Sequence, residues 1–357
     1  MKKLKTGVIG CGLIAQTEWL HYLHELEQYD VVALCDASRE ILDYFGHFYG
    51  VERLYTDWHE LLAQDDIEAV VILTNAHEEV CIAAAKAKKH VLVEKPLCEN
   101  PVQGERIVKA VEESGITFMV GEMKRYDPGF LLAEKMFKEL KGIWMIEAID
   151  LSDGLEHSVN EICQVRFPSD IPKELIAAQE QTIEEGLRGV TGDLPTQLYE
   201  KLLVCGVHFI DLLRASFGDP EEVMNCDIWN DGYIVACELK YGANSRAFFK
   251  VGITNYKEFI EEITAYGEDK IVTVRFPNPL LKNAPTVVEV RETVDNMIVE
   301  QIISPSYEES FRNELVYFHE CVTQSLEPRT SVQEGKKNLD LLNAIFASYA
   351  RRVRNEG

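Results

Sequence analysis

The residue in this chain best placed to do chemistry is Lys95, which stands between Glu94 and Pro96 after a short apolar segment. The segment Val91–Val93 predicts a buried strand of a parallel sheet. Ligands of open α/β sheets bind at the carboxyl ends of the strands, so Lys95 would lie at that edge. There it could give a proton to a bound oxygen or accept one. Pro96 restricts Lys95 to extended backbone and makes a cis bond possible. The alternative is an ordinary surface lysine.

A glycine-rich turn near the start of the chain predicts a second chemical feature. Gly10–Ala15 has the pattern G-x-G-x-x-A, and it follows the predicted strand Leu4–Ile9 and opens a helix that runs to about residue 26. Gly10 permits the tight turn, Gly12 lets the backbone approach a pyrophosphate, and the alanine allows close packing of helix and strand. The free N–H groups of the helix start favour phosphate.

Asp36 supports the same interpretation. It ends a second predicted strand, Val31–Cys35, and comes 21 positions after Ala15. An acid at about this interval binds the adenosine ribose of a dinucleotide. Its charge should repel a 2′-phosphate, which favours NAD over NADP, although Arg39 could soften that preference. The alternative is a strand–turn–helix with a chance acid at the strand end.

A histidine and an aspartate three positions apart lie in the second half of the chain. Apolar residues at helical spacing predict one buried helix over Leu198–Phe217. His208 and Asp211 would share one face of it. A histidine on an apolar helix is more often a hydrogen-bonded core residue than a catalyst, so the residues alone leave both roles open.

Strands and helices alternate through residues 1–123, which predicts an α/β domain with a doubly wound parallel sheet. His77 follows a predicted strand and could contact a cofactor or cap the next helix. The other predicted strands are Arg53–Tyr55, Ile67–Leu73 and Thr117–Val120, and the helices are Ser38–Phe48, Trp58–Ala63, Glu78–Lys89 and Pro101–Ser114.

Residues 124–357 predict an α+β domain with one broad, mostly antiparallel sheet, because its strands are joined by short turns with Gly, Asn, Asp or Pro. A polar stretch over 151–200 contains an acidic helix, Lys173–Gly186, and two helices close the chain, Tyr307–Ser325 and Ser331–Val353. The predicted strands are Trp144–Asp150, Val223–Trp229, Tyr233–Tyr241, Ser245–Thr254, Phe259–Tyr266, Lys270–Arg275, Thr286–Arg291 and Met297–Ile303.

Composition excludes several classes of protein. The net charge of −24 opposes binding to nucleic acid or to an anionic membrane. No apolar run reaches the length of a membrane span and no signal peptide is visible. Nine cysteines without a C-x-x-C pair predict reduced thiols and a cytoplasmic protein. Asp153, Glu156 and His157 are metal-ligand types, but their spacing fits no established site, so we expect no metal.

Together the glycine motif, Asp36, His77, the Glu94–Pro96 tripeptide and the segment Gly121–Pro128 stand in a familiar order. The chain resembles the glucose–fructose oxidoreductase, inositol dehydrogenase and rhizopine-catabolism (Gfo/Idh/MocA) family of NAD(P)-dependent oxidoreductases. The resemblance covers nearly the whole chain, is most specific over residues 1–130 and is weakest over 151–200.

The resemblance implies a Rossmann domain and a second domain that forms the substrate pocket and often the oligomer interface, as a homodimer or homotetramer. It implies hydride transfer at a secondary alcohol or ketone of a sugar, cyclitol or related polyol, with Lys95 and His208 as the catalytic residues. Substrate contacts would come from Lys95, Lys124, Arg125, Tyr126, His208 and Asp211. Cofactor contacts would come from Gly10, Gly12, Leu13, Ile14, Asp36, Arg39, Thr74, Asn75, His77, Glu94, Lys95, Pro96 and Glu122, with NAD as the cofactor and NADP less favoured.

The chain departs from the family pattern D-x-G-x-H-x-x-D at one position. Val204 stands where the family carries its catalytic aspartate, while Gly206, His208 and Asp211 are kept. Either Lys95 and His208 suffice, or the stretch 151–200 supplies another carboxylate. Two alternatives therefore stay open: a nucleotide- or sugar-sensing regulatory protein without turnover, as in a transcription corepressor of the same architecture, and reduction of a substrate that is not a carbohydrate.

Overall fold

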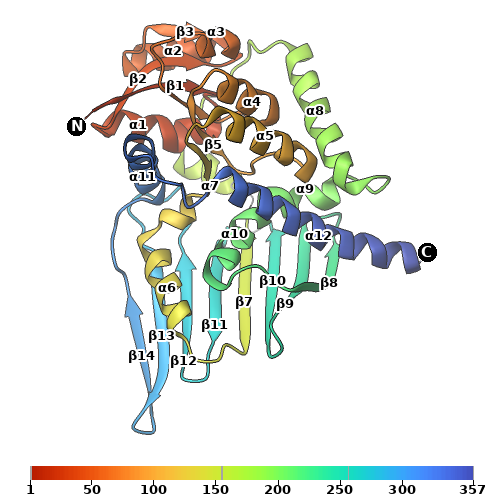
Figure 1. The fold of residues 1–357 in the computed structure, drawn as a ribbon. Helices are drawn as coiled ribbons and strands as arrows, with labels where there is room; N and C mark the ends of the chain where they lie inside the picture. The colour runs from red at the N-terminus through yellow and green to blue at the C-terminus, as the bar shows by residue number, and fades with distance from the viewer. Residues whose placement is uncertain (1, 154–155, 256, 357) are drawn as a thin grey trace. The chain divides into compact units, whose positions relative to one another are not determined.

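The computed structural model describes residues 2–153, 156–255 and 257–356, and Figure 1 colours them along the chain. Contacts between residues divide the chain into two compact units. The first comprises Met1–Glu122, Cys163–Gly189 and Phe311–Leu339, and the second comprises Met123–Ile162, Val190–Ser310 and Asp340–Gly357. Two later segments thus belong to the first unit, although both lie within 124–357, which the sequence predicts to be the second domain.

The first unit is built on a parallel sheet of six strands in the order β3-β2-β1-β4-β5-β6. This order confirms the predicted doubly wound sheet, and β4 and β5 read as near-continuous apolar runs because both faces are covered. The strands are β1 Leu4–Ile9, β2 Tyr29–Cys35, β3 Arg53–Tyr55, β4 Ala69–Ile72, β5 His90–Glu94 and β6 Phe118–Gly121. The helices are α1 Leu20–Glu25, α2 Arg39–Tyr49, α3 Trp58–Leu62, α4 Glu78–Lys86, α5 Pro101–Ser114, α8 Lys173–Thr191 and α11 Ser310–Gln324.

Capping residues define both ends of α2 and α5. The Ser38 hydroxyl accepts a hydrogen bond from the third residue of α2, and the Asn100 side chain caps α5, whose first residue is a proline. Gly50 and Gly115 end these helices with φ of +71° and +68°.

The helix after the glycine turn differs from the prediction. A single helix to about residue 26 was expected, but Ala15–Trp19 forms a π-helix that leads into α1. Trp19 is fully buried there, and its indole Nε1 donates to a Glu94 carboxylate oxygen at 2.7 Å. The wider turn therefore places a tryptophan against the end of β5.

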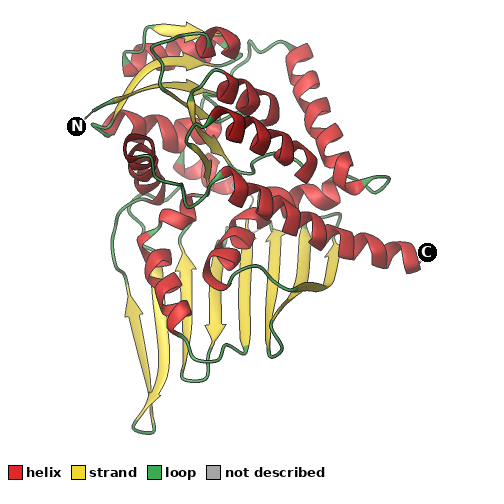
Figure 2. Ribbon diagram, viewed as in Figure 1, coloured by secondary structure: helices red, strands yellow, loops and turns green. Residues whose placement is uncertain are grey.

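The second unit contains a sheet of eight strands in the order β14-β13-β12-β11-β7-β10-β9-β8. Every neighbouring pair is antiparallel except β7 and β10, so the predicted mostly antiparallel sheet is confirmed. Helices α6 and α10 pack on the sheet (Figure 2). The strands are β7 Met145–Ser152, β8 Glu222–Trp229, β9 Ile234–Tyr241, β10 Ser245–Ile253, β11 Ile260–Tyr266, β12 Lys270–Phe276, β13 Val287–Val294 and β14 Met297–Ile303. The helices are α6 Pro128–Glu139, α7 Glu156–Ile162, α9 Gln197–Val204, α10 Gly206–Phe217 and α12 Val332–Glu356, of which the first residues belong to the first unit.

The predicted single helix over Leu198–Phe217 is wrong: α9 and α10 are separate and meet at Cys205. Gly206 begins α10, and a Cβ there would lie 3.2 Å from the Phe249 ring, so the glycine lets the helix approach the sheet closely. The acidic helix predicted over Lys173–Gly186 is present and continues to Thr191. Within the described residues, no helix combines the length and apolarity that a membrane crossing requires.

Candidate active site

The glycine turn has room for a ligand at Gly12 but not at Gly10. Gly10 has φ of +96°, and a Cβ there would lie 2.7 Å from the backbone oxygen of Leu73. Around Gly12 nothing lies within 4 Å of the position a Cβ would take. Leu13 and Ile14 follow as half-buried residues of the first helical turn. The open backbone at Gly12 fits the approach of a pyrophosphate.

Asp36 lies directly after β2 and faces this turn. Its Oδ2 accepts from the backbone N–H of Cys11 and its Oδ1 from that of Ser38, both at 2.8 Å. Each carboxylate oxygen keeps acceptor capacity for a ribose hydroxyl. Burial raises the pKa of Asp36, the charge of Asp170 adds to the rise, and the two hydrogen bonds oppose it. Arg39 is exposed and pairs with Asp43 at 2.8 Å.

Lys95 begins the loop after β5, and a buried acid holds its backbone. The Glu94 side chain accepts from the Lys95 N–H at 3.0 Å as well as from Trp19. Burial raises the pKa of Glu94 above its usual range, while the neighbouring Lys95 charge lowers it. The Lys95–Pro96 bond is cis. The Glu94 carboxylate therefore holds the Lys95 backbone at the carboxyl edge of the sheet.

His77 joins this loop to the loop after β4. Its Nδ1 lies 2.7 Å from the Pro96 oxygen and its Nε2 lies 2.6 Å from the Thr74 oxygen. Burial lowers the pKa of His77, and the hydrogen bonds to these carbonyls oppose that effect. His77 occupies the N-cap position of α4, but its side chain makes no capping hydrogen bond. Of the two roles predicted for His77, capping of α4 by its side chain is thus excluded. Asn75, two residues before His77, is exposed.

The parallel strands bring most predicted cofactor residues of the first unit to one edge. Residues Gly10, Asp36, Thr74, Lys95 and Glu122 follow β1, β2, β4, β5 and β6 near their carboxyl ends. This edge is where doubly wound sheets bind their ligands. The site therefore has the parts a dinucleotide requires: an open glycine turn, a carboxylate, and a lysine on a fixed loop.

In the second unit two predicted substrate residues form ion pairs. Lys124 Nζ lies 2.8 Å from a Glu261 carboxylate oxygen, with side chains 4% and 5% exposed. Arg125 reaches Asp211 at 3.2 Å, and the Asp211 side chain is 1% exposed. Tyr126, the next residue, is buried. His208 is half-buried on α10, one turn before Asp211.

Sequence reasoning missed the buried carboxylates of this sheet. Asp150 and Glu261 stand directly opposite each other on β7 and β11 and are 3% and 6% exposed. The signal was present in the period of β7, where Asp150 falls on the inward face with Ile146 and Ala148. Val204, at the position of the family aspartate, ends α9 with 39% of its surface exposed.

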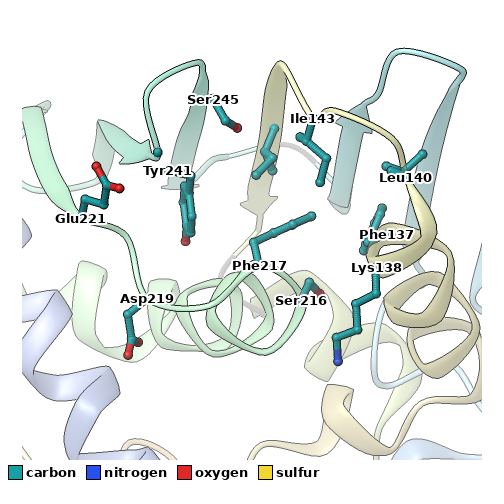
Figure 3. Close-up of a pocket in the computed structure, with 12 residues that line it drawn as sticks. Phe137, Lys138, Leu140, Ile143, Ser216, Phe217, Asp219, Glu221, Tyr241 and Ser245 are labelled. Carbon is teal, nitrogen blue, oxygen red and sulfur yellow. The ribbon is translucent and has the colours of Figure 1, made fainter.

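A cavity of about 500 Å³ lies elsewhere in the second unit, as Figure 3 shows. It is lined by residues of α6, the end of α10 and the β9–β10 turn, among them Phe217, Tyr241 and Ser245. None of the predicted site residues lines it. Among the described residues, no three His, Cys, Asp or Glu side chains gather as metal ligands would, and the nine cysteines are free thiols. Asp153 is described and buried, whereas the side chains of Glu156 and His157 lie outside the described part.

Comparison with known proteins identifies the family. Residues 4–122 match the family model described as "Oxidoreductase family, NAD-binding Rossmann fold". The inositol 2-dehydrogenase of Paracoccus denitrificans is 34% identical over 243 residues, which are 66% of this chain and 71% of that enzyme. The chain belongs to this oxidoreductase family. The inositol 2-dehydrogenase of Salmonella typhimurium is 32% identical over 132 residues, 36% of this chain, and the match spans only 39% of that enzyme's length.

A solved structure supports the fold over the whole chain. A 3-ketoreductase from Actinomadura kijaniata, determined with NADP and TDP-benzene, superposes with a TM-score of 0.75 at 19% identity and covers 98% of both chains. At this identity the likeness shows the fold alone. The family model and the Paracoccus denitrificans relative confirm the family resemblance inferred from the sequence, and the family model confirms an NAD(P)-binding Rossmann fold.

Proposed function

We propose that this protein is an NAD-dependent dehydrogenase that oxidises a secondary alcohol of a sugar, cyclitol or related polyol, or reduces the corresponding ketone. The observation that carries the proposal is Lys95, held by its backbone at the carboxyl edge of a sheet whose glycine turn and Asp36 fit a dinucleotide. The names of its relatives, inositol 2-dehydrogenase among them, support a polyol substrate.

The residues of the first unit would hold the cofactor. The open turn at Gly12 takes the pyrophosphate and Asp36 accepts hydrogen bonds from the ribose hydroxyls. NAD is favoured because the Asp36 carboxylate repels a 2′-phosphate. The bound nicotinamide supplies or accepts the hydride. We assign contacts with the nicotinamide to Thr74, Asn75, Pro96 and Glu122.

Two residues handle the proton. Lys95 takes the proton of the substrate hydroxyl in oxidation and returns it in reduction, and its positive charge stabilises the alkoxide that forms. His208 hydrogen-bonds the same oxygen or relays the proton. We assign contacts with the substrate hydroxyls to Lys124, Arg125, Tyr126 and Asp211. The ion pairs of Lys124 and Arg125 preset the orientation of these two side chains.

The assembly and location form part of the same proposal. We assign a homodimer or homotetramer, because Met297, Ile298 and Ile302 on β14 are large apolar side chains with 60%, 86% and 68% of their surface exposed. A cytoplasmic location is supported by the nine free thiols.

The Lys95→Met variant tests the chemistry. We expect kcat to fall by roughly 10² or more on a turned-over polyol, while calorimetry should show that the variant still binds NAD. Lys109→Met, which removes a lysine with 77% side-chain exposure on α5, should leave kcat unchanged. An unchanged kcat in Lys95→Met would refute the assignment.

A second function is supported by Val204, the apolar residue at the position of the family's catalytic aspartate. A regulatory protein that senses nucleotide or sugar without turnover could do without that carboxylate. Tight NAD binding with no turnover across a panel of sugars and cyclitols, followed by nicotinamide absorbance, would favour this function.

A further inference from the structure

A segment of the first unit that follows the alternating strands and helices lies beside the predicted nucleotide site. Residues 166–170, called the strap below, precede α8, which is yellow-green in Figure 1. The strap is hydrogen-bonded to the rest of the first unit at two places, one close to the glycine turn and one at the start of α2. These two places flank the region between Gly12 and Asp36.

At the glycine turn the strap pairs with one side chain. The Gln16 Oε1 accepts from the Arg166 N–H at 2.8 Å, and its Nε2 donates to the Arg166 oxygen at 3.0 Å and to the Cys11 oxygen at 2.9 Å. The Arg166 guanidinium lies 3.6 Å from the centre of the Tyr44 ring on α2. These contacts fix the strap in register with the turn.

At the other end a carboxylate binds the start of α2. Asp170 Oδ1 accepts from the Ser38 hydroxyl at 2.5 Å and Oδ2 accepts from the Glu40 N–H at 2.9 Å. The free N–H groups of a helix start and a serine hydroxyl are the donors that bind phosphates. Asp170 therefore fills, with the chain's own negative charge, the place where an anion would bind.

That place lies two to four residues beyond Asp36, the predicted ribose ligand. Asp36 Oδ1 accepts from the Ser38 N–H, so Ser38 contacts both carboxylates. These two hydrogen bonds hold the carboxylates close together, and the charge of Asp170 adds to the effect of burial, which raises the pKa of Asp36. A 2′-phosphate on a ribose bound at Asp36 would meet two negative charges and find its donors already occupied.

We propose that Asp170 is a specificity-determining residue that excludes the 2′-phosphate of NADP and so completes the preference for NAD. This proposal rests on the proposed nucleotide site. Asp36 acts on the ribose directly, whereas Asp170 acts by occupying the donors of Ser38 and Glu40. NADP binding requires the Asp170 carboxylate to leave these donors, and NAD binding does not.

Calorimetric titration of the purified full chain with NAD and NADP, without substrate, tests the proposal. Wild type should bind NAD more tightly. Asp170→Ala vacates the start of α2, so its affinity for NADP should rise roughly tenfold while its affinity for NAD stays within about twofold. Glu180→Ala removes one exposed acid from α8 and should leave the ratio of the two affinities unchanged.

Asp170→Asn guards against a loosened strap, because its amide oxygen can still accept from the Glu40 N–H, while the charge and one of the two acceptor oxygens are lost. It should move the ratio of affinities toward NADP by a smaller factor. An unchanged ratio in Asp170→Ala, with NAD still bound, would overturn the role of Asp170 and leave the proposed function standing. Wild type that binds NADP more tightly than NAD would also overturn it. Wild type that binds neither nucleotide would refute both proposals.

Discussion

Glu99 offers a test of how the segment carrying α8 is held on the first unit. It is 5% exposed and directly precedes the N-cap of α5, where its backbone N–H donates to the Gln103 side chain at 3.1 Å. A Cβ on Gly186 of α8 would lie 2.7 Å from the Glu99 Cβ, so the helix covers this acid closely. Burial, with a smaller contribution from the charge of Glu78, raises the pKa of Glu99 to about 7.

The sign of the effect follows from proton linkage. Glu99 binds its proton more tightly in the folded protein than in the unfolded chain, where its pKa is 4.5. The folded state therefore binds more protons between pH 4.5 and 7, and stability falls as the pH rises through that window. The full shift corresponds to about 3 kcal/mol at 1.36 kcal/mol per pKa unit. Partial solvation of the ionised acid would reduce it, so we expect about 2 kcal/mol.

Glu99→Gln removes the charge and keeps the size of the side chain. We expect the variant to be about 2 kcal/mol more stable than wild type at pH 8 and nearly equal at pH 4.5, as measured by urea unfolding at both values. Many carboxylates titrate in this range, but they cancel in the difference between the two proteins. Glu113→Gln, an exposed acid on α5, should show no such pH dependence. A Glu99→Gln effect of equal size at both pH values would refute the reasoning.

Two further predictions concern the glycine turn and the buried ion pair. Gly12→Ala should leave the free energy of unfolding almost unchanged, because its methyl group would enter only the open space at the turn, but it should weaken NAD binding at least tenfold. Gly10→Ala should instead destabilise the fold by about 1–3 kcal/mol, because Gly10 has φ of +96° and its Cβ would meet the backbone of Leu73. Urea unfolding and calorimetry distinguish the two, and equal effects would contradict the assignment. Lys124→Met should lower unfolding free energy by about 3–5 kcal/mol because it strands the Glu261 charge, and adding Glu261→Gln should recover most of the loss; additive losses in urea unfolding would contradict this.

The sequence predicted the elements well where local signals define them. The predicted bounds of β1, β3 and α5 agree with the structure, because an apolar run, a capping asparagine before a proline and a terminal glycine are all properties of neighbouring residues. The two helices that replace one over residues 198–217 were missed for the opposite reason. The apolar pattern continues through the break at Cys205, and the close approach of Gly206 to Phe249 of a distant strand is not a property of neighbouring residues.

Contacts between distant parts of the chain explain the rest of what was missed. Residues 163–172 look like a loop of mixed composition, and nothing in that composition indicates that Asp170 binds Ser38, 132 positions earlier. The pairing of Asp150 with Glu261 likewise follows from strand register. His77 was predicted as a cofactor contact or helix cap, but the structure ties its side chain to the Pro96 loop instead of capping α4.

This difference bears on how the preference for NAD should be understood. Asp36 could be assigned from sequence because a strand end and a glycine turn fix its place, and the sequence predicted a cofactor preference set by Asp36 and softened by Arg39. In the structure Asp36 shares Ser38 with a second carboxylate that arrives from a segment outside the alternating strands and helices. The prediction from Asp36 alone is that its replacement by serine suffices for NADP binding. The structure predicts otherwise, because Asp170 would still occupy the donors at the start of α2 after that replacement.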